Sequence, residues 1–84
     1  MGLPTGPVTL TVEQIEDLNK KLSMMRHDVN GHLALVVAAA ELIRHKPQLS
    51  EKMLTSIAEQ PAKISEAMKA FSIECERVLG ITRP

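Results

Sequence analysis

The sequence is poor in aromatic residues and in cysteine. Among its 84 residues, Phe71 is the one aromatic residue and Cys75 the one cysteine, so the chain can form no internal disulfide and offers no set of rings for base stacking. Its ten basic and ten acidic residues cancel, which removes the positive charge typical of nucleic-acid-binding proteins. The longest apolar run, LALVVAAA, is far shorter than the roughly 20 residues of a transmembrane helix. We therefore expect no nucleic-acid partner, no direct membrane insertion and a reducing, cytoplasmic location.

Start and stop signals predict two long helices. Thr11 begins a capping box, T-V-E-Q, in which two side chains satisfy free backbone amides at a helix start. Pro47 ends the first helix, because the residue before a proline disfavours the helical conformation. Ser50 is the expected N-cap of the second helix, and Gly80 is its expected C-terminal stop.

These signals divide the chain into a lead-in, one helical domain and a tail. The lead-in, over residues 1–10, is expected to be flexible, because it carries no helix signal. We expect a helical-hairpin domain over residues 11–80, with helix one at about 12–46, a turn at 47–50, helix two at about 51–79, and a tail over 81–84.

Apolar residues recur at spacings of three and four along both helices, which is the pattern of heptad seams. The first seam is Ile15, Leu18, Leu22, Met25, Val29, His32, Val36, Ala39 and Ile43, and the second is Leu54, Ile57, Pro61, Ile64, Met68, Phe71, Cys75 and Val78. A turn this short makes the helices antiparallel, and extra leucines make the first seam wider than one partner helix covers. The predicted fold is therefore all-α: an antiparallel two-helix hairpin that dimerises into a four-helix bundle.

The two histidines of RHDVNGHL fall on different faces of the first helix. With Ile15 at heptad position a, His32 takes position d in the seam, and His27 takes position f on the outermost face. We expect His32 to be structural, with Asp28, four residues earlier, as its hydrogen-bond partner. His27 is expected to be exposed to solvent.

The outer face around His27 is built from small or apolar residues. A glycine inside a helix, here Gly31, is less favourable than alanine by about 1 kcal/mol, which suggests that another molecule approaches the backbone there. The alternative is that a long helix simply tolerates one glycine. Beyond it, Ala34, Val37 and Ala38 point outward with nothing in the chain to cover them, so with Gly31 they form the expected partner-docking surface.

A metal site is a weaker interpretation of these residues. His27 and His32 point to different sides, and Asp28 with His32 supplies two ligands where a zinc site needs three or four. We expect no metal and no cofactor bound to this chain.

The stretch RHDVNGHLALVVAAAELI resembles the phosphoacceptor motif, the H-box, of sensor histidine kinases. A long helix, a short turn and a return helix are also similar to the dimerization and histidine-phosphotransfer domain of that family. Family members carry an acidic residue directly after the histidine, as Asp28 follows His27 here. The resemblance implies that His27 is autophosphorylated from ATP and passes the phosphate to a response-regulator aspartate. It implies that Asp28 fixes the ring tautomer and acts as acid or base, with Asn30 as a candidate polar assist.

The resemblance also implies partners, although this sequence departs from the family pattern at two positions. The partners are a second copy, an ATP-binding catalytic domain acting in cis or in trans, and a receiver domain. The chain has no glycine-rich phosphate loop, so ATP with Mg²⁺ would bind a catalytic domain expected beyond residue 84. Family members often place Asn or Thr where this chain has Gly31, and proline where it has His32, which leaves phosphatase activity open.

Three functions therefore remain in view. The first is the dimerization and phosphoacceptor fragment of a histidine kinase, which is not catalytically complete without its ATP-binding domain. The second is a stand-alone histidine phosphotransfer protein that does not bind ATP. The third is a purely structural dimeric helical hairpin.

Overall fold

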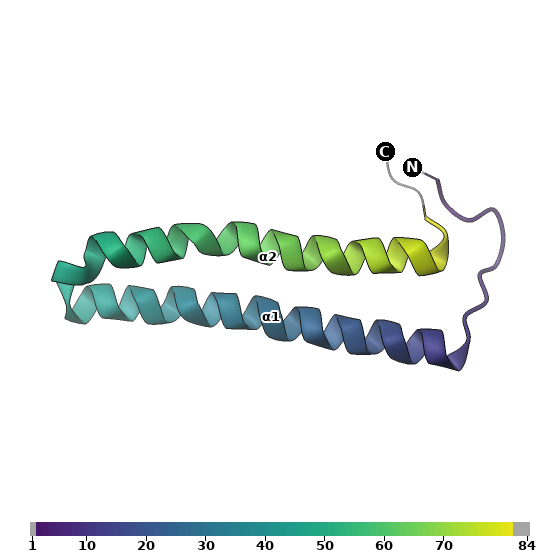
Figure 1. The fold of residues 1–84 in the computed structure, drawn as a ribbon, viewed down its shortest axis with the longest axis horizontal. Coiled ribbons are helices and arrows are strands. Elements are labelled where there is room, and N and C mark those ends of the chain that lie inside the picture. The colour runs from purple at the N-terminus through teal and green to yellow at the C-terminus, as the bar shows by residue number, and fades with distance from the viewer. Residues whose placement is uncertain (1, 82–84) are drawn as a thin grey trace.

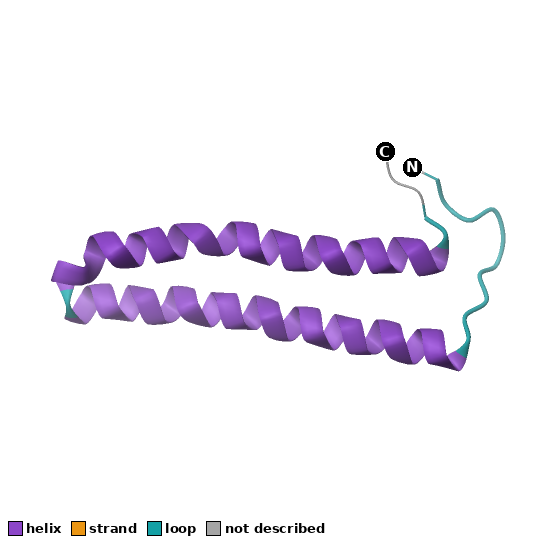
Figure 2. Cartoon of the chain, in the orientation of Figure 1, coloured by secondary structure: helices purple, strands orange, loops and turns teal. Residues whose placement is uncertain are grey.

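The computed structural model describes residues 2–81 and is an all-helical, antiparallel hairpin. Helix α1 (Val12–His45) is followed by a single 3-10 turn, η1 (Pro47–Leu49), and by helix α2 (Ser50–Leu79). The two long helices lie side by side, so α1 begins and α2 ends at the same end of the molecule, which we call the open end (Figure 1). Colouring by secondary structure shows that helices make up nearly all of the chain after the lead-in (Figure 2). The predicted hairpin is confirmed, and each helix boundary lies within one residue of its expected place.

Local hydrogen bonds explain where the helices begin and end. At the start of α1 the Thr11 hydroxyl accepts a hydrogen bond from the Gln14 amide at 3.1 Å, and the Gln14 side chain accepts one from the Thr11 amide at 2.8 Å. Gly80 ends α2 in the left-handed conformation, with φ of 69°, which a residue without Cβ adopts at no steric cost. The prediction for Ser50 is wrong: Ser50 is already helical and Leu49 precedes the helix, because the Ser50 hydroxyl donates to the Pro47 carbonyl at 2.6 Å instead.

The contact between the helices follows the predicted seam in α1 but only half of the predicted seam in α2. From Leu18 to Ile43, every predicted seam residue of α1 is at least partly buried, whereas Ile15, near the open end, is 53% exposed. In α2 the helix-facing residues are Met53, Ile57, Gln60, Ile64, Ala67, Phe71, Glu74 and Val78. The predicted seam members Leu54, Pro61 and Met68 are exposed, because each lies one position round the helix from the contact.

Two overlapping stripes at heptad spacing cause this error. One stripe of α2 faces α1 and includes the polar residues Gln60 and Glu74. The other is uncharged and lies beside the contact; it is Leu54, Ala58, Pro61, Ser65, Met68, Ser72, Cys75 and Leu79. The predicted seam took its members alternately from the two stripes. Its members from the first stripe lie in the contact, whereas most of those from the second are exposed.

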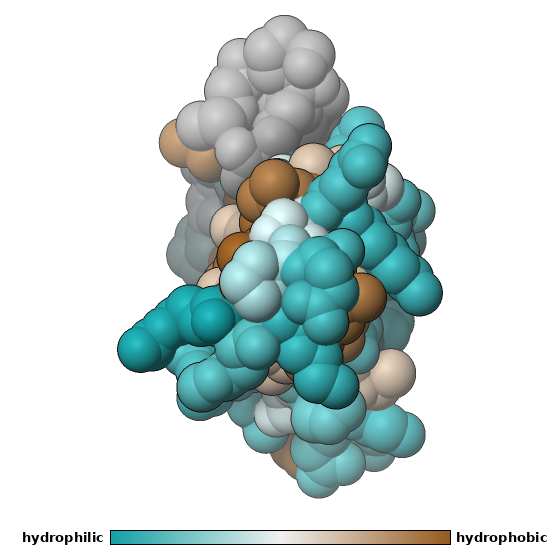
Figure 3. Space-filling view, turned by 90° about the vertical axis from the view of Figure 1, so that its left-hand side faces the viewer, coloured by the Kyte–Doolittle hydropathy of each residue, from teal (hydrophilic) through white to brown (hydrophobic). Residues whose placement is uncertain are grey.

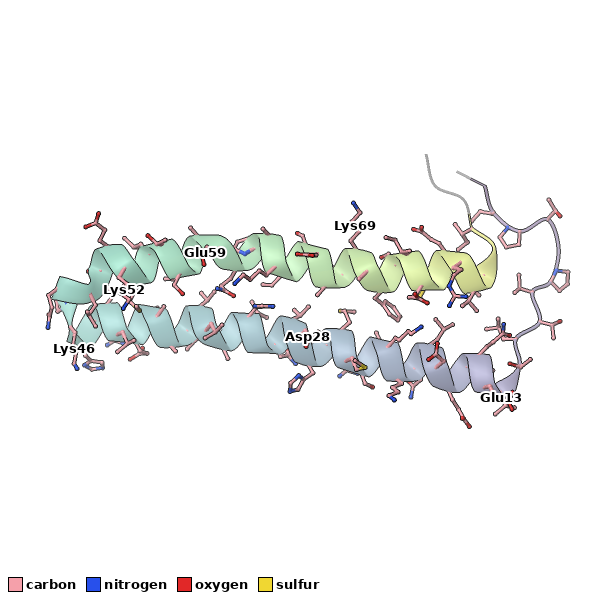
Figure 4. The ribbon with its side chains drawn as sticks, in the orientation of Figure 1. Glu13, Asp28, Lys46, Lys52, Glu59 and Lys69 are labelled. Carbon is pink, nitrogen blue, oxygen red and sulfur yellow. The ribbon has the colours of Figure 1, made fainter. Side chains whose placement is uncertain are left out.

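The hairpin is flat and therefore has two broad faces. Its dimensions are 58 × 28 × 11 Å, so it is only one helix thick. On one face a hollow of about 330 Å³ opens between Arg26 and Asn30 of α1 and Met68 of α2, and we call this the Met68 face. On the opposite side a hollow of about 180 Å³ opens between Asp28 of α1 and Ala70 of α2, and we call this the Asp28 face. Labelled Lys69 points away from α1 on the outer edge of α2, between the two faces (Figure 4).

A single hairpin buries very little. Ala39, at 4% exposure, and Gln60, at 3%, are the only fully buried residues among those the structure describes. The accessible surface is 6465 Å², whereas a compact chain of 9.2 kDa would expose about 4,900 Å². The radius of gyration, 18.1 Å, likewise exceeds the roughly 12 Å of a compact domain of this length. Apolar side chains accordingly reach the surface between polar ones in the view from the turn (Figure 3).

A cluster of four charged residues ties the helices together near the open end. Lys21 Nζ lies 2.9 Å from both Asp17 Oδ2 of its own helix and Glu74 Oε2 of α2, and Arg77 lies 2.7 Å from the same Glu74 oxygen. Hydrogen bonds from Arg77 and then from Lys21 hold the pKa of Glu74 below its ordinary value. Hydrogen bonds to Asp17 and Glu74 raise the pKa of Lys21.

Glu74→Gln should lower the thermal midpoint at neutral pH, because it removes the carboxylate that links Lys21 to Arg77. A carboxyl group whose pKa is lowered by folding contributes stability above its unfolded pKa and loses it as pH falls through the folded value. The difference between wild type and Glu74→Gln should therefore vanish in acid below the ordinary carboxyl range, and it should shrink in 1 M salt. Circular dichroism melts at several pH values measure it. Glu59→Gln removes the same charge from α2 outside the cluster and should show no such pH-dependent difference.

Candidate functional site

His27 projects from the outer edge of α1. Its side chain is 90% exposed, and the neighbouring Asp28 side chain is 61% exposed. Asp28 Oδ1 lies 3.8 Å from His27 Nδ1, which is longer than a hydrogen bond, so the carboxylate must turn toward the ring to make one. Because Asp28 lies on the Nδ1 side, Nε2 is the ring nitrogen left for another molecule.

The neighbours of His27 on α1 differ between its two sides. Ser23 and Asn30 lie one turn before and one turn after it toward the Met68 face, and Met24 and Gly31 lie at the same heights toward the Asp28 face. Asn30 lines the hollow on the Met68 face, and its side chain makes no hydrogen bond to another described residue. A Cβ added at Gly31 would meet nothing within 4 Å, so packing within this chain does not require a glycine there.

The expected docking residues are all uncovered. Gly31, Ala34 and Ala38 are exposed, and Val37 is 63% exposed, more than the large apolar residues Leu33, Leu35 and Leu42 near it. They continue from His27 along the outer edge of α1 toward the turn. Leu33 and Leu35 are also about half exposed, so apolar groups surround this part of the helix on every side that α2 does not cover.

His32 lies in the contact between the helices as expected, but the prediction that Asp28 is its partner is wrong. His32 Nδ1 lies 2.8 Å from Oε1 of Gln60, a residue of α2 that sequence reasoning did not single out. Gln60 Nε2 donates to the Ser56 carbonyl at 3.0 Å, which fixes the orientation of the amide. Since Oε1 can only accept, His32 must carry its proton on Nδ1. Asp28 cannot take this role because it lies outside the contact.

The third histidine, His45, sits at the last turn of α1. Its Nε2 lies 3.4 Å from Glu41 Oε2, and Glu41 also pairs with Arg44 at 3.1 Å. Of the three histidines, His27 alone therefore combines high exposure, an adjacent acid and an unpartnered ring nitrogen.

Residues missed by sequence reasoning lie around Met25, which lines both hollows. The hollow on the Asp28 face runs from Asp28 to Lys21 and Glu74, with Phe71 and alanines of α2 beside it. The i,i+4 spacing of Asp17 and Lys21 signals a local pair, but the link to Glu74 depends on the register between helices, which sequence does not give.

The described residues 2–81 contain no cluster of three or more His, Cys, Asp or Glu side chains that could hold a metal ion. Over the same residues, neither helix has an apolar segment able to cross a membrane.

Comparison with protein-family models, with curated proteins and with solved structures found no match to this chain.

The His32–Gln60 pair gives a test of the packing. Gln60→Leu should destabilise the protein by about 1–3 kcal/mol, because it leaves the Nδ1–H of His32 without an acceptor. His32→Leu combined with Gln60→Leu should recover much of that loss, since no polar group is then left unpaired. Urea unfolding of the two single variants and the double variant measures the coupling. Additive losses would mean that the two side chains do not form the hydrogen bond.

Proposed function

We propose that this hairpin is the dimerization and phosphoacceptor unit of a two-component phosphorelay, with His27 as the phosphorylated residue. The observation that carries the proposal is the setting of His27: an imidazole that is 90% exposed, with a carboxylate 3.8 Å from Nδ1 and a bare glycine one turn away. The resemblance of RHDVNGHL to the H-box supports the same assignment.

The chemistry is a phosphoryl transfer at one ring nitrogen. The lone pair of His27 Nε2 attacks phosphorus, forming an N–P bond while the P–O bond to the leaving group breaks. In autophosphorylation the leaving group is the ADP oxygen of ATP, and in the reverse relay step it is a receiver aspartate. Asp28, turned to accept the Nδ1 proton, holds the reactive tautomer and stabilises the positive charge that develops on the ring.

The partners follow from this role. ATP with Mg²⁺ would be held by a separate catalytic domain, in cis or in trans, and a receiver domain would dock on Gly31, Ala34, Val37 and Ala38. Both steps take place in the cytoplasm. A stand-alone phosphotransfer protein would use the same residues and differ only in its donor, a phosphorylated receiver instead of ATP. Asn30, beside His27, is the candidate polar assist.

A dimer is the form that fits the surface. The chain exposes about 1,500 Å² more than a compact protein of its mass, and a stable interface takes about 800 Å² from each partner. A second hairpin packed against the first would form a four-helix bundle and, with an interface of that size, cover about half of the excess.

His27 should be the one residue that is phosphorylated. With a phosphorylated receiver or a competent catalytic domain as donor, the product should be a phosphoramidate, labile in acid and stable in base. His27→Gln should abolish it and leave the helicity unchanged, since the side chain packs against nothing. Asp28→Asn should slow the transfer by about 100-fold or more, because an amide cannot stabilise the charged ring. Rapid-quench radiolabel transfer measures both. Label that persists in His27→Gln, or that lies on His32 or His45, would leave the structural hairpin as the better description.

The docking surface should carry recognition without carrying the fold. Ala38→Glu should slow phosphoryl exchange with a receiver domain by about tenfold or more, because it puts an unpaired carboxylate in the interface. Stopped-flow or quench kinetics give the rate. Ala62→Glu makes the same change on the outer edge of α2 and should leave the rate unchanged. Loss of helicity in Ala38→Glu would instead place Ala38 in a packing contact.

A further inference from the structure

The two broad faces of the hairpin differ in charge. Along α2, the stripe on the Met68 face carries no charged residue from Leu54 to Leu79. The matching stripe on the Asp28 face is Lys52, Ser56, Glu59, Lys63, Glu66, Ala70, Ile73 and Arg77, of which five are charged. A charged stripe stays in water at little cost, whereas an uncharged stripe at heptad spacing is what a neighbouring helix covers.

From this difference we infer that a second copy of the hairpin packs on the Met68 face and leaves the Asp28 face open. The inference deepens the dimer of the proposed function by assigning its interface. Leu54 and Met68 of α2, at 57% and 51% exposure, and Leu33 of α1, at 48%, would be its apolar contacts.

The occupant is a second copy because of length, symmetry and charge. The uncharged stripe covers residues 54–79, about 39 Å of helix, and this chain itself supplies a helix long enough to cover it, α1, with 34 residues. On the same face α1 presents Leu33 and Ala40, with Arg26 and Arg44 on the same stripe, so the face carries apolar groups from both helices and can pair with itself about a two-fold axis. The chain has a net charge of zero, so there is no overall charge repulsion between two copies.

The assignment has a consequence for the phosphoacceptor. Asp28 and the hollow between Lys21 and Glu74 lie on the Asp28 face, which the second copy leaves uncovered. The carboxylate beside His27 therefore stays accessible in the dimer. Arg26 and Asn30 lie instead at the covered face, beside the second copy. A phosphoryl donor or acceptor therefore reaches His27 from the outer edge and from the Asp28 side.

Two matched pairs of substitutions test the assignment. Met68 and Ile73 are both 51% exposed on α2 but lie on opposite faces, and Leu33 and Leu35 of α1 are 48% and 52% exposed on opposite faces. Met68→Lys and Leu33→Glu should raise the dimer dissociation constant by about tenfold or more, since each buries an unpaired charge and the new ammonium at position 68 would face Arg26. Ile73→Lys and Leu35→Glu should leave it unchanged. Analytical ultracentrifugation gives the constants, and circular dichroism checks helicity.

A measurement on the unmutated protein removes any dependence on variants that fail to fold. In a dimer mixed from labelled and unlabelled chains, nuclear Overhauser contacts between copies should reach the Met68 and Leu54 methyl groups and not the Ile73 methyl groups. A monomeric chain, equal dissociation by all four variants, or contacts to Ile73 in place of Met68 would overturn the inference. Because none of these readouts involves phosphate, an unphosphorylated His27 would remove the proposed function and leave the interface standing.

Discussion

Two helices of this length touch along a single line, and the rest of the structure depends on that limit. The contact buries Ala39 and Gln60 almost completely. In the half of α1 nearer the turn, the large apolar side chains that α2 does not cover stay about half exposed. Burial of apolar surface is the main favourable term in folding, so a core this thin contributes little to the stability of an isolated hairpin. Because the hairpin is flat, its two broad faces offer the largest areas for the proposed second copy.

The same heptad register that pairs the helices also places the candidate chemistry. A residue two positions after a seam residue points away from the contact, and His27 stands in that relation to Met25. Exposure of the imidazole is therefore a by-product of the packing of α1 and requires no pocket. Asp28 follows on the side of one broad face, so in the proposed dimer the face that the second copy covers decides whether the carboxylate stays in solvent.

Local signals predicted the parts of the fold that local forces determine. The capping box at Thr11 and the glycine at position 80 act through neighbours within a few residues, and the structure has both. Only half of the α2 seam was predicted, because two stripes one position apart satisfy the same spacing and both carry apolar residues. The partner of His32 was missed for a related reason: Gln60 reaches it only once the register between the helices is set. For the site, position f of His27 followed from the sequence, whereas the 3.8 Å separation from Asp28 did not.

The hydrogen bonds Lys21–Glu74 and His32–Gln60 cross between the helices, and their α1 residues lie six residues before and five residues after His27. Apolar contacts tolerate sliding, since one methyl group replaces another, but a hydrogen bond does not survive a displacement of one residue, about 1.5 Å along the axis. The pair of contacts thus fixes the height of His27 relative to α2. A force along either helix at the open end acts first on the Lys21 contact, and the segment that carries His27 slides past α2 only if the His32 contact also breaks.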